Sequence, residues 1–245
     1  MSRIIQIKNK HTNSYLVEYQ ENEFILVDGC FDFEYDTFLK TIFEHGVVPE
    51  QIKYVVLTHI HAHNTGCIRR FLNERDTFLI YNKLDELRIQ AGKNNFKTYV
   101  CGFIRLSISK VYIFLEKYNT FKTVRTDKYI DPKSQPFKKY GIEFLFLPGH
   151  TKNNIQLLVE NTLICGDLCA NGFWFSSKNA PVWMENKFDL TRSWEEILQN
   201  EKIKTIAPLH GKLFEKDELV DSLETWKEKG VFRLVTTRKN NKLSI

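Results

Sequence analysis

The chain lacks the features that define several specialised classes of protein. It has five cysteines among 245 residues, and no two of them form a CxxC pair. This excludes a zinc ribbon and a thioredoxin-like motif. An odd number of widely spaced cysteines is most simply explained by reduced thiols, so we expect a cytoplasmic protein.

Long apolar runs are also missing. A membrane-spanning helix needs about 18 consecutive apolar residues, and the most apolar long stretch, residues 103–115, is interrupted by Arg105 and Lys110. The first ten residues alternate polar and apolar types and lack the apolar core of a signal peptide. We therefore expect no membrane partner.

Charge of one sign is not concentrated anywhere in the sequence. The chain has 35 basic and 30 acidic residues, which gives a net charge of +5. A nucleic-acid binder usually gathers its basic residues in a patch, so we expect a small-molecule substrate and no nucleic-acid partner. The sequence gives no indication of the oligomeric state.

Glycine and proline are sparse, at 11 and 6 residues, and no segment rich in them divides the chain. We therefore predict one domain over residues 1–245. Short apolar runs typical of buried strands alternate with helical spacing, which predicts an α/β or α+β architecture with helices covering sheets. The predicted strands are residues 23–27, 54–57, 77–81, 142–147, 155–159, 162–165 and 204–207, and the predicted helices are residues 34–44, 67–73, 84–90, 193–200 and 216–229.

Two details of these elements can be tested. Ser193 and Glu196 have the spacing of a capping box, so we expect Ser193 to begin its helix. Apolar residues at positions 104, 108, 111 and 115 suit a helix, so we predict a helical insertion around residues 92–130, followed by a connecting loop.

The seven histidines carry the chemical signal. His59, His61 and His63 directly follow the apolar run that ends at Leu57. Alternation by two places side chains on one face while the chain is extended, and two imidazoles on one face can bind a single ion. Neutral imidazole suits Zn²⁺ well.

Three further metal-ligand side chains come at the ends of predicted strands. They are His150, Asp167 and His210, and each has a glycine beside it. Ligands at the ends of several strands can converge on one edge of a sheet. We therefore predict a metal centre formed by His59, His61, His63, His150, Asp167 and His210.

These residues resemble the metallo-β-lactamase superfamily, whose signature is T-H-x-H-x-D-H-x-G, followed by G-H, G-D and a second G-H-type motif. The matching segments are Thr58 to His61, Gly149-His150, Gly166-Asp167 and His210-Gly211. The resemblance covers roughly residues 3–215. It implies a four-layer αββα sandwich with the metal ions at one edge of two packed sheets.

The chain departs from the family pattern at one pair, where His63-Asn64 replaces Asp-His. The resemblance implies a first site with His59, His61 and His150, and a second with Asp167 and His210. His63 could complete the second site, whereas the neutral amide of Asn64 is a poor zinc ligand. We expect one or two zinc ions, with iron or manganese as alternatives.

The implied activity is a metallo-hydrolase that uses a zinc-bound hydroxide to cleave a small ester, lactone, thioester or related bond. His63 and Asp167 are the candidate catalytic residues. Asp28 is either a partner for the second N–H of a ligand histidine or a turn residue before Gly29. The alternatives are a mono-iron sulfur dioxygenase-like enzyme, a nuclease, or a catalytically eroded metal-binding protein of the same fold.

Overall fold

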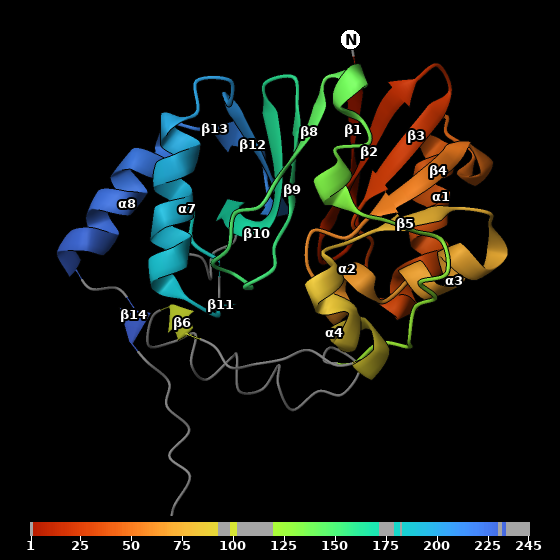
Figure 1. The fold of residues 1–245 in the computed structure, drawn as a ribbon, viewed down its shortest axis with the longest axis horizontal. Helices are drawn as coiled ribbons and strands as arrows, with labels where there is room; N and C mark the ends of the chain where they lie inside the picture. Colours follow the sequence, from red (N-terminus) through yellow and green to blue (C-terminus); the bar gives the residue numbers. More distant parts are fainter. Residues whose placement is uncertain are drawn as a thin grey trace, which may run out of the picture.

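Two mixed β-sheets face each other, and helices cover the outer face of each (Figure 1). The computed structural model describes residues 2–92, 99–101, 120–171, 179–181, 183–229 and 232–233. The layers follow the order helix, sheet, sheet, helix, which confirms the expected αββα sandwich.

The first sheet has six strands in the order β1-β2-β3-β4-β5-β7. Its first three strands form an antiparallel meander, and β3, β4, β5 and β7 then pair in parallel. The strands are β1 (Arg3–Lys8), β2 (Asn13–Gln20), β3 (Glu23–Val27), β4 (Ile52–Val56), β5 (Phe78–Ile80) and β7 (Tyr129–Ile130). The helices of this half are α1 (Tyr35–Glu44), α2 (Ala62–Thr65), α3 (Ile68–Glu74) and α4 (Glu86–Ala91).

The second sheet has five strands in the order β13-β12-β10-β9-β8. Here β8, β9 and β10 are antiparallel, and β10 pairs in parallel with β12. The strands are β8 (Ile142–Leu145), β9 (Gln156–Val159), β10 (Thr162–Asn171), β12 (Thr205–Gly211) and β13 (Phe214–Glu215). Helices α7 (Lys187–Gln199) and α8 (Glu218–Lys229) lie on its outer face (Figure 1).

Alternate residues of the central strands belong to different cores, because successive side chains of a strand point to opposite faces. Leu16 and Leu26 pack outward beneath α1 and α3, whereas Val17 and Ile25 pack between the two sheets. A third core, which contains Trp194, lies between the second sheet and α7 and α8. Three cores separate four layers, and this is why the strands read as nearly continuous apolar runs.

Three short strands form a separate small sheet in the order β11-β6-β14. They are β6 (Tyr99–Cys101), β11 (Trp183–Met184) and β14 (Phe232–Arg233). The helical spacing predicted at residues 104–115 lies outside the described residues. In the described parts of the predicted insertion, residues 99–101 and 120–130, the chain forms β6 and β7 and no helix.

Two local predictions were wrong. Helix α7 begins at Lys187 and not at Ser193, because the side chain of Asn186 caps it by accepting hydrogen bonds from the N–H groups of Phe188 and Asp189. Asp167 does not end its strand, because β10 continues to Asn171. The pairing of β10 with β12 is irregular between Gly166 and Ala170, which breaks the ladder around Asp167.

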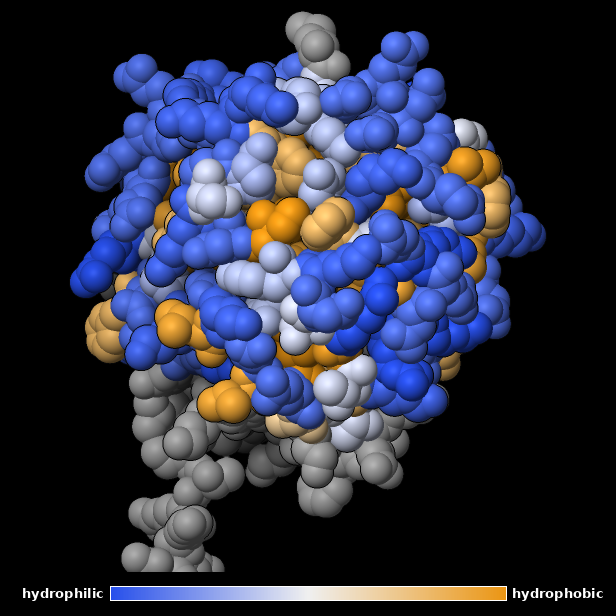
Figure 2. Space-filling model, turned by 45° about the vertical axis from the view of Figure 1, so that its right-hand side comes forward, coloured by the Kyte–Doolittle hydropathy of each residue, from blue (hydrophilic) through white to orange (hydrophobic). Residues whose placement is uncertain are grey.

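One face of the molecule shows how polar and apolar side chains are distributed on the surface. The face drawn in Figure 2 is largely hydrophilic, and its apolar side chains form separate small groups. In the described part of the chain, no helix combines the length and the apolar composition that a membrane crossing requires.

Candidate metal centre

The segment that follows β4 presents three histidines, two before the short helix α2 and one within it. His59 lies in a bend just after β4 and His61 follows in extended backbone, and their ring centroids are 4.8 Å apart. His63 lies in the short helix α2, which turns its ring back toward His59. The Nε2 atoms of His59 and His63 are 3.3 Å apart, so the helical turn, and not alternation, brings in the third imidazole.

The loop after β8 supplies the fourth histidine from the opposite sheet. His150 Nε2 is 3.1 Å from His61 Nδ1, which joins side chains 89 positions apart in the sequence. Gly149, with a φ of +146°, makes this approach possible, because a Cβ there would lie 2.5 Å from the Cα of Leu190 in α7. Close packing against α7 thus fixes the position of His150.

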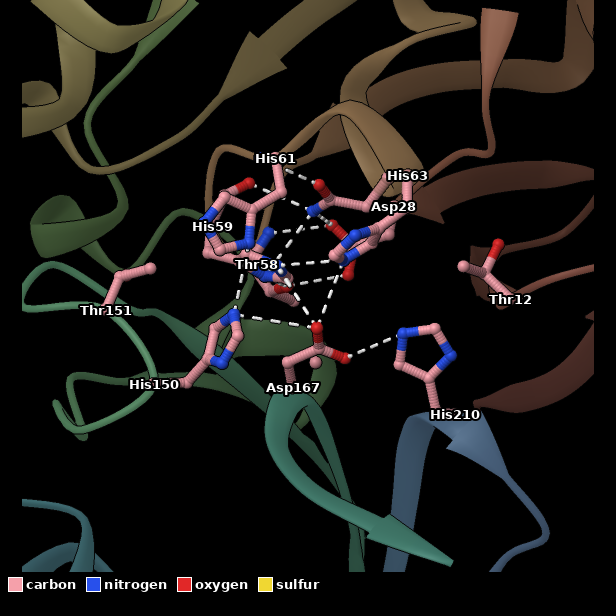
Figure 3. Close-up of polar contacts among 12 residues, drawn as sticks. Thr12, Asp28, Thr58, His59, His61, His63, His150, Thr151, Asp167 and His210 are labelled. Carbon is pink, nitrogen blue, oxygen red and sulfur yellow. Dashed lines mark hydrogen bonds and ion pairs between the residues drawn. The ribbon is translucent and has the colours of Figure 1, made fainter. Parts of the chain in front are cut away.

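Asp167 lies between the imidazoles and joins both halves of the cluster (Figure 3). Its Oδ2 atom is 3.1 Å from His63 Nε2, 3.5 Å from His150 Nε2 and 3.6 Å from His59 Nε2. Its Oδ1 atom is 3.5 Å from His210 Nε2. All six residues predicted as ligands therefore meet at one place between the two sheets.

The hydrogen-bonded partners fix which nitrogen of two rings carries the proton. The Nδ1 atom of His59 lies 2.9 Å from Thr58 Oγ1, whose hydroxyl donates to Asp28, so this Nδ1 is the donor. The Nδ1 atom of His210 lies 3.1 Å from the backbone carbonyl oxygen of His11, so it is a donor too. Both Nε2 atoms are then left as lone-pair acceptors that face the carboxylate of Asp167.

Acceptors that face each other in a buried site are stabilised by a cation between them. In the described part of the chain, Asp167 Oδ1 has no hydrogen-bond partner. Donor atoms about 2.1 Å from a tetrahedral zinc ion stand about 3.4 Å apart, and the spacings here run from 3.1 to 3.6 Å. The ligand atoms of His59, His61, His63 and Asp167 all lie within 4.8 Å of one another. These residues fit a metal ion.

Burial and the neighbouring charges shift the pKa values of these groups toward the protonation states that bind a cation. Desolvation, followed by the charge of the neighbouring imidazoles, lowers the pKa values of His59 and His61 well below their ordinary value. Burial alone would raise the pKa of Asp167, but the imidazoles of His210 and His63 hold it well below its usual range. Neutral imidazoles and an ionised carboxylate are the forms that bind metals.

Asp28 supports the cluster from behind. Its carboxylate accepts hydrogen bonds from the N–H of Thr58 at 2.9 Å and from the hydroxyl of Thr58 at 2.6 Å. Burial raises the pKa of Asp28 to about 6, against the effect of these hydrogen bonds. Asp28 has a left-handed backbone conformation with a φ of +56° just before Gly29. Among the described residues, the predicted direct hydrogen bond to a ligand histidine is not observed, because Asp28 is linked to His59 through the side chains of Thr58 and Asn64.

Sequence reasoning missed two residues that hold the centre. The backbone of His11, in the loop between β1 and β2, orients His210, while its ring pairs with Glu34 at 2.9 Å. The side chain of Asn64 is fully buried and bonds to Asp28 and to the ligand loop. Only Asn64 gave a signal in the sequence, because it stands where the family has a histidine.

The comparisons with known proteins agree with this geometry. A family model, described as the metallo-beta-lactamase superfamily, matches residues 8–210. A probable metallo-hydrolase of Methanocaldococcus jannaschii is 24% identical over 205 residues, which cover 82% of this chain and 88% of the relative.

Solved structures of the same fold were also found. An archaeal metallo-β-lactamase superfamily protein from Sulfolobus tokodaii has a TM-score of 0.63 and 17% identity, covering 92% of this chain and 86% of its own. A metallo-β-lactamase with a HARLDQ motif from Cronobacter sakazakii has a TM-score of 0.58 and 16% identity, covering 84% and 76%. Together, the fold, the cluster and the family match show that the chain belongs to the metallo-β-lactamase superfamily.

Proposed function

We propose that the protein is a zinc-dependent hydrolase that cleaves a small ester, lactone, thioester or related bond. One observation carries this proposal: five imidazoles and one carboxylate converge at a buried point, with acceptor atoms directed at one another. The most economical use of such a cluster is to hold a Lewis-acidic cation. A small molecule that reaches this cluster is the proposed substrate.

The roles of the side chains follow from their positions. His59, His61 and His150 would hold the cation, together with Oδ2 of Asp167. His63 Nε2 faces both His59 Nε2 and Asp167 Oδ2, which supports His63 as a further donor in the same site. Its Nε2 has a single lone pair, so as a donor it does not also act as the base.

The remaining groups support one ion per chain. Once the donors of the first site are assigned, Asp167 Oδ1 and His210 Nε2 are the donors left at the far side of the carboxylate. Two donors make an incomplete protein site for a second zinc ion, because structural and catalytic sites use three or four.

A bound zinc ion supplies Lewis acidity, which polarises a substrate carbonyl and makes water acidic near neutral pH. The chain must then accept a proton close to the cluster. The position of Asp167 Oδ1 suits this task, because it faces His210 Nε2 at 3.5 Å and has no hydrogen-bond donor among the described residues. His210, whose ring is held by the carbonyl of His11, would receive the proton or orient the carboxylate.

The proposal is tested by hydrolysis assays on a panel of aryl esters, lactones and thioesters, before and after chelation. We expect turnover with at least one of these classes, its loss after chelation and its return with Zn²⁺. His59→Ala should abolish the activity, whereas His45→Ala should not, because His45 is an exposed residue after α1.

Two outcomes would contradict the proposal. Turnover that survives complete removal of metal would show that the cation is not needed. Return of activity with Fe²⁺ and oxygen on thiol substrates, but not with Zn²⁺ on esters, would identify the iron-dependent alternative instead.

A further inference from the structure

Asn64 occupies a position where the family pattern has a metal-binding histidine. The difference could mean that a ligand was lost, or that the position has a different task in this chain. The side chain of Asn64 is completely buried in the short helix α2. Its contacts distinguish between these two possibilities.

The side-chain amide of Asn64 has no capacity left for a cation. Its Oδ1 accepts from the backbone N–H of His61 at 3.1 Å and from the hydroxyl of Thr65 at 3.3 Å. Its Nδ2 donates to the backbone carbonyl of His59 at 2.9 Å and to Asp28 Oδ1 at 2.8 Å. An asparagine amide has two donor and two acceptor sites, and all four are in use.

The partners of this amide are the backbones of two ligand residues and the carboxylate behind them. The amide therefore ties His59 to His61 and ties both to Asp28, which follows the end of the neighbouring strand β3. The main chain adds a parallel tie, since the N–H of Gly29 donates to the carbonyl of Asn64 at 2.7 Å. The loop that presents His59, His61 and His63 is closed on itself by this one side chain.

No other side chain of similar size can replace this amide. A neutral imidazole has one donor and one acceptor, and a carboxylate has no donor at all. An aspartate at position 64 would also bring a second buried carboxylate within hydrogen-bond distance of Asp28. Asparagine supplies two donors to oxygen atoms and an acceptor to a backbone N–H from a single planar group.

We propose that Asn64 is a positioning residue, whose amide sets the shape of the ligand loop and directs His59, His61 and His63 toward the cation. Asn64 is therefore not the remnant of a second metal site. This inference rests on the proposed function, because it concerns residues that hold the proposed cation. It explains the two departures from the family pattern together: His63 contributes an imidazole to the cluster, and Asn64 holds the loop that carries it.

The decisive variant restores the residue of the family pattern, Asn64→His. The readouts are the zinc content per chain, the zinc dissociation constant from competition with a chromophoric chelator, and the visible spectrum of the Co²⁺-substituted protein. We expect a content no higher than that of the wild type and a Kd raised about 10- to 100-fold, the usual cost of losing a partner behind the ligands. The Co²⁺ spectrum should change, because the ligand histidines are reoriented.

Gln135→Ala is the matched control. The amide of Gln135 also makes two hydrogen bonds to one backbone residue, Phe144, at 2.8 Å each, but it lies on a loop before β8. This variant should lower thermal stability without changing the Kd for zinc or the Co²⁺ spectrum. The comparison separates the loss of an amide that bonds to the backbone elsewhere in the chain from the loss of the one at the metal centre.

A measurement on the wild type applies if the variant does not fold. In protein labelled with ¹⁵N-asparagine, both Nδ2 protons of Asn64 should exchange slowly with solvent, with and without zinc. Rapid exchange would overturn the proposal, as would an Asn64→His variant that binds two ions or binds zinc as tightly as the wild type. A wild type that binds no metal would instead refute the proposed function. The exchange rate of the Asn64 Nδ2 protons would then still test whether this amide holds the ligand loop.

Discussion

Individual side chains behind the ligands determine how well the cluster can hold a cation. Asp28, Thr58 and His59 form a chain of hydrogen bonds in which the hydroxyl of Thr58 connects the carboxylate to the ring. This connection places the proton of His59 on Nδ1 and leaves Nε2 to face Asp167. Outer partners of this kind fix both the tautomer and the orientation of a ligand histidine.

Removal of the Thr58 hydroxyl tests this chain of hydrogen bonds. We predict that Thr58→Val, which keeps the branched shape, weakens zinc binding about 10- to 100-fold. Thr58→Ser keeps the hydroxyl and should bind zinc nearly as the wild type does. Zinc competition titrations measure both variants, and equal affinity of the valine variant and the wild type would contradict the assigned role.

The pH dependence of stability also belongs to single residues. Burial lowers the pKa values of His59, His61 and His210, so in the folded chain they remain neutral where unfolded histidines, near 6.5, become protonated. The unfolded state then binds more protons, and stability must fall as the pH falls through about 6.5. Asp28, with a pKa of about 6, and Asp85, whose pKa burial also raises, act in the opposite direction, but we expect the three buried histidines to outweigh them.

We therefore predict that the metal-free protein has a lower free energy of unfolding at pH 5.5 than at pH 7.5. Urea denaturation at both values measures the difference, and a double variant with His59→Gln and His61→Gln should reduce it. Equal or greater stability at pH 5.5 would show that these imidazoles are not held neutral by the fold.

At the scale of elements, a close backbone approach at a glycine places Asp167 beside the other ligands. Gly166 in β10 has a φ of +58°, and a Cβ at this position would lie 2.3 Å from Thr58 Oγ1. The contact brings β10, and hence Asp167, against the loop that follows β4. The irregular pairing of β10 and β12 beyond Gly166 then frees the strand to turn Asp167 toward the cluster.

Gly166→Ala should therefore lower the free energy of unfolding through backbone strain and should also weaken zinc binding. The left-handed conformation alone costs about 1–2 kcal/mol for alanine, and the displaced Thr58 should also weaken zinc binding. Gly141→Ala is the control, because Gly141 has a φ of +76° and a Cβ there would have no atom within 4 Å. Denaturation and zinc titration should show the strain in both variants but the loss of zinc affinity only at position 166.

Most elements could be predicted from the sequence, and the failures have physical reasons. The strand at residues 23–27 was predicted at its observed bounds, because its apolar run is bounded by polar residues and a turn. The start of α7 could not be predicted because Lys187 to Thr191 have a weak apolar pattern, whereas the capping-box spacing at Ser193 and Glu196 indicated a later start. The full length of β10 was missed because Gly166 and Asp167 resemble a strand end when their irregular pairing is not known.

The ligand residues of the candidate site could be predicted from the sequence, but the groups that hold them in place could not. All six residues singled out in the sequence meet in the structure. They could be recognised because the chain has only seven histidines, five of which belong to the cluster. The hydrogen bonds of the Asn64 side chain and the contact of the His11 carbonyl with His210 could not be predicted. A backbone acceptor has no sequence signature, and an amide is common in any loop.

At the scale of the whole molecule, the site joins the two halves of the sandwich. His59, His61 and His63 follow strand β4 of the first sheet, whereas Asp167 and His210 lie in β10 and β12 of the second sheet and His150 lies in the loop between β8 and β9. A cation between them would connect the sheets across the central core. Because the unfolded chain has no such site, binding should add directly to the free energy of folding.

Equilibrium dialysis of the metal-free protein against Zn²⁺, combined with a thermal unfolding curve of each sample, is the sharpest test of the proposed metal centre. We predict one tightly bound ion per chain and a higher Tm in the wild type, and neither change in a variant that combines His59→Ala with His61→Ala. If the wild type bound no zinc ion, or if that variant bound as much zinc as the wild type, these side chains would not form a metal centre.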